Sequence, residues 1–250
     1  MVTTKTLTPE MVEAIFVECL VWSLGGLIVE EDRERFDNVV KKLSEMNLIN
    51  TVAQPINLNE LPGNGRIIYD FHFDLDELKW NPWQNYVSTY THDPNLKFHQ
   101  ILVPTMDTMR HYWLVDKISS IKKPCLVVGQ VGTAKTVTIQ YFLRQLAKDK
   151  NIVLNMNFSS RTSSLSVQRN LEANVEKRTK DTYGPTAGKR LLVFIDDLNM
   201  PQKDTYGTQQ PIALLKLLIE KGGIYDRGKE LNWKYLKDVQ FTASMGPPVS

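Results

Sequence analysis

A glycine-rich turn that leads into Lys-Thr is the part of this sequence best suited to chemistry. It reads Gly129-Gln130-Val131-Gly132-Thr133-Ala134-Lys135-Thr136 and follows the apolar run Cys125-Leu126-Val127-Val128. This is the layout of a phosphate-binding P-loop, G-x-x-x-x-G-K-[ST], except that Ala134 takes the place of the second glycine. Backbone N–H groups in such a turn, with the positive end of the next helix, form an anion cradle. We expect Lys135 to reach the β- and γ-phosphates of a nucleotide and Thr136 to bind Mg²⁺.

The alanine inside this loop tests the assignment. Glycine lets the backbone pass close to the phosphates, and the methyl group of Ala134 narrows the allowed dihedral angles. If the backbone at this position is helical, alanine costs nothing and favours the start of the helix. We therefore expect phosphate binding to survive the change.

A buried strand that ends in two acids supplies the second half of a nucleotide site. The apolar run 191–195 is followed by Asp196 and Asp197. In P-loop ATPases the first acid of such a strand holds Mg²⁺, usually through water, beside the P-loop hydroxyl. We assign Asp196 to the metal and expect its strand to be adjacent to the P-loop strand. The alternative is a buried strand that ends in a helix-capping aspartate.

The composition limits the class of protein. Of 250 residues, 42% are hydrophobic and 23% are charged, with a formal net charge of +2, as in ordinary soluble domains. Dispersed Lys and Arg residues give no case for nucleic-acid binding. The most apolar run, 14–29, contains Glu18 and is too short to span a bilayer comfortably, and no signal-peptide core follows the first residues. We expect a soluble intracellular protein that contacts neither nucleic acid nor membrane.

Residues with other reactive side chains form no recognisable site. Cys19 and Cys125 lie in separate apolar segments, and we interpret both as small core residues in a reducing compartment. The four histidines are scattered without metal-ligand spacing. No Ser/His/Asp or Cys/His group stands out as a nucleophile.

Alternating strands and helices from residue 98 onward must position the P-loop and the acids. The expected strands are 124–128, 151–158, 189–195 and 238–243, and the expected helices are 105–120, 136–148, 163–180 and 211–221. Apolar strands that alternate with helices indicate a parallel α/β sheet covered on both faces. Ligands of such sheets bind at the carboxyl ends of the strands, where the P-loop also lies.

The first part of the chain has a different pattern. Residues 8–49 are predicted to be helical, with Thr8 as N-cap and a second helix over 32–43. A loop rich in Asn, Pro and Gly follows, and period-two alternation over 66–73 predicts a half-buried strand. The aromatic cluster after it is expected to pack onto a neighbouring domain rather than to stack on a base; it comprises Trp80, Trp83 and Tyr86, with Pro82 among them.

Two polar stretches have structural and functional alternatives. The loop 159–164, Ser-Ser-Arg-Thr-Ser-Ser, could reach toward the site, but capping of the next helix is favoured. Glu176, Lys177 and Arg178, with Lys180, are interpreted as a solvated face of the helix predicted over 163–180.

Several longer blocks resemble the motor region of dynein heavy chains, the axonemal ones above all. Besides the P-loop with its Ala-Lys-Thr ending, they are 101–108 (Ile-Leu-Val-Pro-Thr-Met-Asp-Thr), 158–162 (Phe-Ser-Ser-Arg-Thr), 183–185 (Tyr-Gly-Pro), 194–201 (Phe-Ile-Asp-Asp-Leu-Asn-Met-Pro), 225–227 (Tyr-Asp-Arg) and 245–248 (Met-Gly-Pro-Pro). The similarity is to the third of the six AAA+ modules of the dynein ring. The segment 21–26, Val-Trp-Ser-Leu-Gly-Gly, looks like part of the lid of the module before it.

This resemblance implies an α/β P-loop fold of AAA+ type, preceded by a small helical lid. It divides the chain into a lid-like segment 1–50, a connecting segment 51–97 and the P-loop large subdomain 98–250, whose own lid is absent. Leu102, Val103 and Pro104 are then expected to line an adenine pocket, while the P-loop and Asp196 bind ATP or ADP with Mg²⁺.

The resemblance also implies that hydrolysis is weak. AAA+ ATPases typically have Glu at the position of Asp197, where it orients the attacking water, and general-base geometry is strict enough for one missing methylene to matter. Asp197 could instead cap the turn at 199–201. A sensor, often Asn, is expected near the end of the fourth strand, but 243–246 reads Ala-Ser-Met-Gly, so Ser244 is only a weak substitute. We predict binding without brisk turnover at a regulatory site.

The partners implied are neighbouring AAA+ modules of the same heavy chain and dynein complex subunits, with microtubules reached only through the parent motor. The implied location is the cytoplasm and cytoskeleton, in the axoneme of cilia or flagella.

Two other functions remain open at this point. One is a self-sufficient P-loop ATPase or GTPase, and the other is a structural ring segment whose pocket has decayed.

Overall fold

The computed structural model describes residues 8–45, 66–92, 94, 95, 97 and 101–248. The chain divides into two compact units, Met1–Tyr90 with Pro104–Arg110, and Thr91–Val103 with His111–Ser250. Each unit has a hydrophobic core of its own. Within the described residues, no helix is long and apolar enough to cross a membrane.

The first unit is built on two helices. α1 (Pro9–Ser23) begins as predicted, with Pro9 at the first helical position and the Thr8 hydroxyl accepting from Met11 N at 3.4 Å. Short 3₁₀ turns (η1 Gly25–Leu27, η2 Glu30–Asp32) lead to α2 (Arg33–Glu45). The core of this unit contains Val17, Val21, Val40, Ile68 and Tyr69.

The predicted strand over 66–73 is wrong in its first half. Ile68–Asp70 form a 3₁₀ turn (η4), and the strand β1 is only Phe71–Asp74, paired antiparallel with β2 (Lys79–Pro82). The cause is side-chain bonding to the backbone, because the buried carboxylate of Asp37 accepts from Ile68 N at 2.7 Å and Asp70 accepts from Ile67 N at 3.3 Å. Ile68 and Tyr69 are therefore both buried, whereas consecutive residues of a half-buried strand would face opposite sides.

The aromatic cluster belongs to this unit. Trp83, in the 3₁₀ turn η5 (Trp83–Tyr86), is 2% exposed, stacks on His72 and meets Trp22 of α1 edge to face. The rings pack within their own unit and not onto a neighbouring domain as predicted, because His72 and Trp22 of the same unit cover Trp83.

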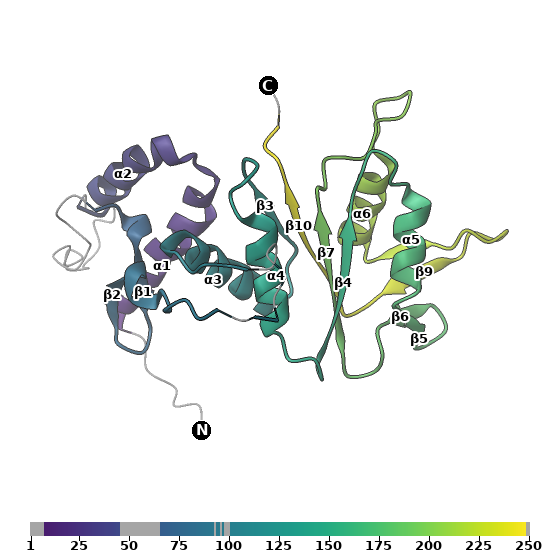
Figure 1. Ribbon diagram of the computed structural model, residues 1–250, viewed down its shortest axis with the longest axis horizontal. Helices are drawn as coiled ribbons and strands as arrows, with labels where there is room; N and C mark the ends of the chain where they lie inside the picture. The colour runs from purple at the N-terminus through teal and green to yellow at the C-terminus, as the bar shows by residue number, and fades with distance from the viewer. Residues whose placement is uncertain (1–7, 46–65, 93, 96, 98–100, 249–250) are drawn as a thin grey trace. The chain divides into compact units, whose positions relative to one another are not determined.

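Four parallel strands form the sheet of the second unit. They are β3 (Cys125–Val128), β4 (Asn151–Asn157), β7 (Arg190–Asp196) and β10 (Val239–Met245), in the spatial order β3-β10-β7-β4. The predicted parallel α/β sheet is confirmed. The predicted adjacency of the P-loop strand and the acid-ending strand is wrong, because β10 lies between them (Figure 1).

Helices cover both faces of this sheet. On β7, Leu192 and Phe194 pack with Val115 of α3 (Met106–Ser120) and Phe142 of α4 (Lys135–Gln145). Leu191, Val193 and Ile195 face the other way. They pack with α5 (Ser164–Glu172) and α6 (Gln210–Lys221), as Figure 1 shows. The almost wholly apolar β7 is thus buried on both sides, as a central parallel strand should be.

A second, smaller sheet was not predicted. It has the order β5-β6-β9-β8 and is made of Glu176–Lys177, Thr182–Gly184, Trp233–Leu236 and Gly223–Tyr225. The helix expected over 163–180 ends at Glu172, so Glu176, Lys177 and Arg178 are not on a helix face. Arg178 instead forms an ion pair with Asp238 at 2.5 Å and donates to Pro185 O at 2.8 Å.

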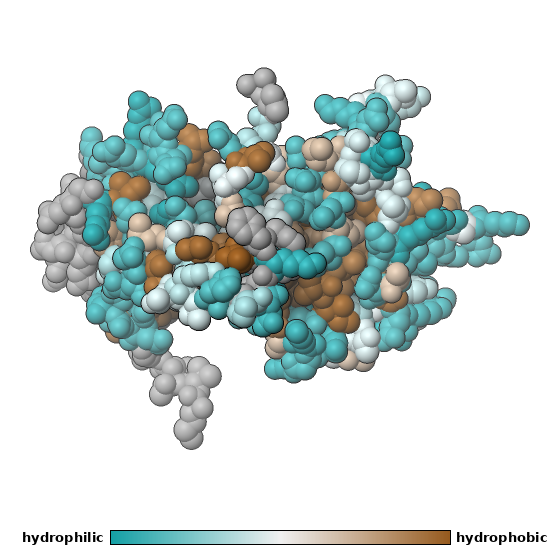
Figure 2. Space-filling model, viewed as in Figure 1, coloured by the Kyte–Doolittle hydropathy of each residue, from teal (hydrophilic) through white to brown (hydrophobic). Residues whose placement is uncertain are grey.

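The two cysteines differ from the expected core residues. Cys19 is exposed because it lies on the side of α1 that carries Val12 and Phe16, which are 51% and 66% exposed. Cys125 is half-buried, and burial raises the pKa of its thiol. Apolar side chains reach the surface in several patches among polar ones (Figure 2).

Candidate nucleotide site

The P-loop joins β3 to α4 as the sequence predicts. Gly132 has φ +85°, a conformation that favours glycine. Lys135 Nζ donates to Gln130 O at 2.6 Å, and Thr133 Oγ1 donates to the same carbonyl at 2.8 Å. Gly129 N donates to Met245 O at 3.3 Å, so the start of the loop is held against the end of β10.

Ala134 is not helical, which corrects the expectation that alanine is cost-free there. Its φ and ψ are 58° and 17°, in the left-handed region. A side chain with Cβ costs roughly 1–2 kcal/mol in that region. The conformation persists because Ala134 is the N-cap of α4, where its carbonyl accepts from Thr138 N at 2.9 Å.

Three donors converge on one oxygen of Asp196. Thr136 Oγ1 donates to Asp196 Oδ1 at 3.0 Å, Ser244 Oγ donates to the same atom, and Asp197 N does so at 3.2 Å. The structure thereby brings Thr136 and Asp196 together, as the sequence assignment to one metal site requires. A hydroxyl and a carboxylate are the hard oxygen ligands that Mg²⁺ takes beside nucleotide phosphates, so the residues present fit this ion.

Ser244 is the site residue that sequence reasoning undervalued. It is 1% exposed and, through its hydroxyl, ties β10 to the acid at the end of β7. Its role follows from the strand order, which places β10 between the P-loop strand and β7. The signal in the sequence was a small hydroxyl residue near the carboxyl end of a strand, where ligands of parallel sheets bind.

Asp197 leaves the strand in an unusual conformation. Its φ is 57°, its side chain is exposed, and its carbonyl accepts from Met200 N at 3.0 Å. The backbone of Asp197 therefore opens the turn that precedes Pro201. Its role toward an attacking water stays a prediction.

The loop after β4 is held close to this acidic end of the sheet. Phe158 N donates to Asp196 O at 2.9 Å, and Gln202 N donates to Ser160 O at 3.3 Å. Farther along the loop, Ser163 caps α5 by accepting from Ser166 N at 3.1 Å, which confirms the capping role favoured for 159–164.

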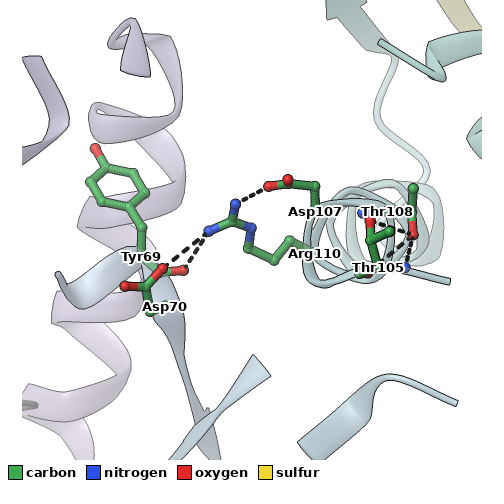
Figure 3. A network of polar contacts seen from close by, with 6 residues as sticks. All are labelled: Tyr69, Asp70, Thr105, Asp107, Thr108 and Arg110. Atoms are coloured by element: carbon green, nitrogen blue, oxygen red, sulfur yellow. Dashed lines mark hydrogen bonds and ion pairs between the residues drawn. The ribbon is translucent and has the colours of Figure 1, made fainter. Parts of the chain in front are cut away.

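The Val-Pro-Thr segment leads into α3. Val103 is 56% exposed, and Thr105 and Thr108 cap the helix reciprocally, each backbone N–H donating to the other's hydroxyl at 2.8 and 3.2 Å (Figure 3). The role of Leu102, Val103 and Pro104 in an adenine pocket stays a prediction.

Arg110, one turn into α3, is almost fully buried. Its guanidinium donates to Tyr69 O at 3.0 Å, lies 3.7 Å from Asp70 and pairs with Asp107 (Figure 3). This network fixes the first turn of α3 against η4 of the same unit. Among the described residues, no group of three or more His, Cys, Asp or Glu side chains forms a separate metal site.

Comparison with known proteins identifies the family. The family described as "P-loop containing dynein motor region" matches residues 90–250, and the "Dynein heavy chain AAA lid domain" matches residues 2–85. The chain belongs to the dynein heavy chains. The sequence-based assignment to this family, and to a P-loop fold of AAA+ type, is thereby confirmed.

Individual dynein heavy chains are similar over nearly the whole length of this chain. Human dynein axonemal heavy chain 10 is 54% identical over 237 residues, which cover 95% of this chain and 5% of the relative. The dynein-1-alpha heavy chain of the flagellar inner arm I1 complex of Chlamydomonas reinhardtii is 54% identical over 244 residues, 96% of this chain and 5% of the relative. Human dynein axonemal heavy chain 2 is 36% identical over 239 residues, again 95% and 5%. The chain thus spans about one-twentieth of the length of these dyneins.

Proposed function

We propose that this dynein segment is the nucleotide-binding core of the third AAA+ module, preceded by the lid of the second module. In this proposal residues 1–50 belong to that lid, 51–97 connect, and 98–250 bind ATP or ADP with Mg²⁺. The convergence of Thr136 and Ser244 on Asp196 Oδ1 is the observation that carries it. That arrangement supports the proposal, because a P-loop hydroxyl and a strand-end carboxylate that lie together are suited to bind one metal ion.

Each residue of the site has a proposed task. The backbone N–H groups of 129–134 and the ammonium of Lys135 hold the phosphates, while Thr136 and Asp196 hold Mg²⁺. When bound, Mg²⁺ neutralises charge on the phosphate oxygens. Ser244 keeps the Asp196 carboxylate oriented, because its hydroxyl donates to the carboxylate from a position shielded from water.

The site is proposed to regulate rather than to drive the motor. Asp197 is one methylene shorter than glutamate, and a base displaced by about 1 Å can cost on the order of 10²-fold in rate. Ala134 in a left-handed conformation adds strain to the same loop. Slow or absent hydrolysis is proposed because of the short acid, and retained binding is proposed because Ala134 keeps the left-handed path of the loop.

The parent protein is proposed to be an ATP-driven microtubule motor of cilia or flagella, because the names of its relatives are axonemal and flagellar. Neighbouring AAA+ modules and dynein complex subunits are the direct partners. Microtubules are reached through other parts of the heavy chain.

Calorimetric titration with ATP and ADP in the presence of Mg²⁺, beside single-turnover hydrolysis, tests the proposal. Lys135→Ala should weaken binding of both nucleotides by at least tenfold, because it removes the charge that meets the phosphates. Lys150→Ala, at an exposed lysine just before β4, is the matched control and should bind as the unchanged chain does. Rapid steady-state turnover by the chain alone would favour a self-sufficient ATPase, and the absence of any binding would favour a structural segment.

A further inference from the structure

The end of β10 lies directly beside the P-loop. Met245 is paired with Val128, the last residue of the P-loop strand, and its carbonyl accepts from Gly129 N at 3.3 Å. The next residue, Gly246, has no side chain. A side chain supplied by another segment next to Gly246 is therefore placed at the rim of the phosphate cradle.

Asn199 supplies such a side chain. Its Nδ2 lies 3.9 Å from the position that a Cβ on Gly246 would occupy, which is ordinary van der Waals contact. The two residues come from different segments, the turn after β7 and the end of β10. Their meeting is a consequence of the strand order, since β7 and β10 are neighbours in the sheet.

The backbone that carries Asn199 is held from both sides. Leu198 N donates to Ser244 O at 3.0 Å, which extends the pairing with β10 beyond the strand. Gln209, the N-cap residue of α6, donates from Nε2 to Asn199 O at 3.0 Å and to Pro201 O at 2.6 Å. A fixed backbone limits where the carboxamide of Asn199 can go.

The chemistry of the neighbours leaves a task for this carboxamide. The hydroxyl of Ser244 donates to Asp196, the carboxylate proposed to bind Mg²⁺, so it is already engaged. A carboxamide is neutral and offers two N–H donors together with one acceptor. Asn199 follows Asp196 by three positions, and a Mg²⁺ ion held by that acid would neutralise charge on the phosphates of a bound nucleotide.

We infer that Asn199 donates to the terminal phosphate of a bound nucleoside triphosphate and so distinguishes triphosphate from diphosphate. The inference rests on the proposed nucleotide site. It differs from the expectation that a sensing group would sit on β10 itself. Here β10 contributes a glycine that makes room, and the turn after β7 contributes the donor.

Calorimetric titrations of the full chain with a non-hydrolysable ATP analogue and with ADP, both with Mg²⁺, test the inference. Asn199→Ala should weaken the triphosphate by about tenfold, as expected for one lost hydrogen bond to a charged group. ADP binding should stay within about twofold, since the diphosphate lacks the group concerned. Asn170→Ala, at an exposed asparagine on α5, is the matched control and should change neither affinity.

A rescue variant separates a direct contact from a structural effect. Asn199→Ala combined with Gly246→Asn places a carboxamide in the same space from the β10 side, and Gly246 has no positive φ that would strain asparagine. This double variant should recover part of the preference for triphosphate.

Equal weakening of both nucleotides, no change in either, or no recovery in the double variant would overturn the inference. If the unchanged chain binds neither nucleotide, the proposed function fails as well. If it binds both and loses both on Lys135→Ala, but is indifferent to Asn199→Ala, only the role of Asn199 fails.

Discussion

At the scale of single residues, Ala134 shows how a P-loop can keep its path while losing a glycine. The left-handed backbone that glycine would supply freely is present, with φ 58°, and alanine occupies it. The strain is local, since the neighbouring Gly132 at φ +85° still takes the other left-handed position of the loop. A substitution at Ala134 can therefore change the stability of the loop without changing its backbone path.

Ala134→Gly should increase the free energy of unfolding by about 1 kcal/mol, because it removes a left-handed conformation from a residue with Cβ. Ala173→Gly is the matched comparison, since Ala173 has ordinary helical angles (φ −68°) at the end of α5. That change should instead cost about 0.5–1 kcal/mol. Urea unfolding of the two variants measures both values. A loss of stability in both would contradict the claim that Ala134 adopts a strained left-handed conformation.

The residue types of the site could be predicted from the sequence, but the assembly of the site could not. Lys135, Thr136 and Asp196 are recognisable because their spacing after apolar strands is characteristic. The role of Ser244 was missed because it depends on the order of the strands in the sheet. The local sequence pattern predicts strands but does not predict their order. The sequence analysis placed Asn199 only in the turn 199–201, and the role proposed for it depends on the same strand order.

At the scale of elements, long periodic segments were predicted well and short ones were missed. The four main strands and the helices α3, α4 and α6 match the predicted segments to within about three residues. The small sheet has strands of two to four residues, too short to show periodicity. The turn Ile68–Asp70 was taken for strand because its cause, the carboxylate of Asp37, is distant in sequence.

The small sheet depends on a close approach at Gly223. This residue begins β8 directly after Gly222, which ends α6 in the left-handed conformation with φ +69°. A Cβ on Gly223 would lie 2.5 Å from Lys234 O and 2.7 Å from the Trp233 ring. Backbone and a packed indole leave it no room.

Gly223→Ala should therefore lower the free energy of unfolding by about 1–3 kcal/mol, the usual range for overpacking. Gly26→Ala is the control, because nothing lies within 4 Å of a Cβ at that position. Thermal unfolding compares the two variants. Equal effects would mean that the approach of β9 to Gly223 is looser than described.

At the scale of the whole molecule, the raised pKa of a partly buried tyrosine makes stability sensitive to alkali. Tyr86 is a group whose titration opposes folding. Burial raises the pKa of Tyr86 to about 12, and its hydrogen bond to Asp74, 2.8 Å long, acts in the same direction.

Because the folded pKa of Tyr86 lies above the ordinary value of 10.0, the folded state holds this proton more tightly. Its contribution to stability is complete below pH 10 and is lost as the pH rises from 10 to 12. Urea unfolding at pH 9 and at pH 11.5 should show a larger loss in the unchanged chain than in Tyr86→Phe. Tyr206→Phe, at a residue 92% exposed, should behave as the unchanged chain does.

The position of β10 has a consequence for the order in which the site can form during synthesis. The P-loop strand finds its described sheet partner only in residues that leave the ribosome more than a hundred positions later, since Cys125 pairs with Thr242. Until β10 has paired with both, the P-loop strand and the strand that carries Asp196 are not joined by backbone pairing. Contacts between residues far apart in sequence are slow to form. The incomplete sheet therefore stays exposed on the nascent dynein chain until β10 has been synthesised and has paired. The proposed nucleotide site is therefore complete only after β10 has paired with both of its neighbours.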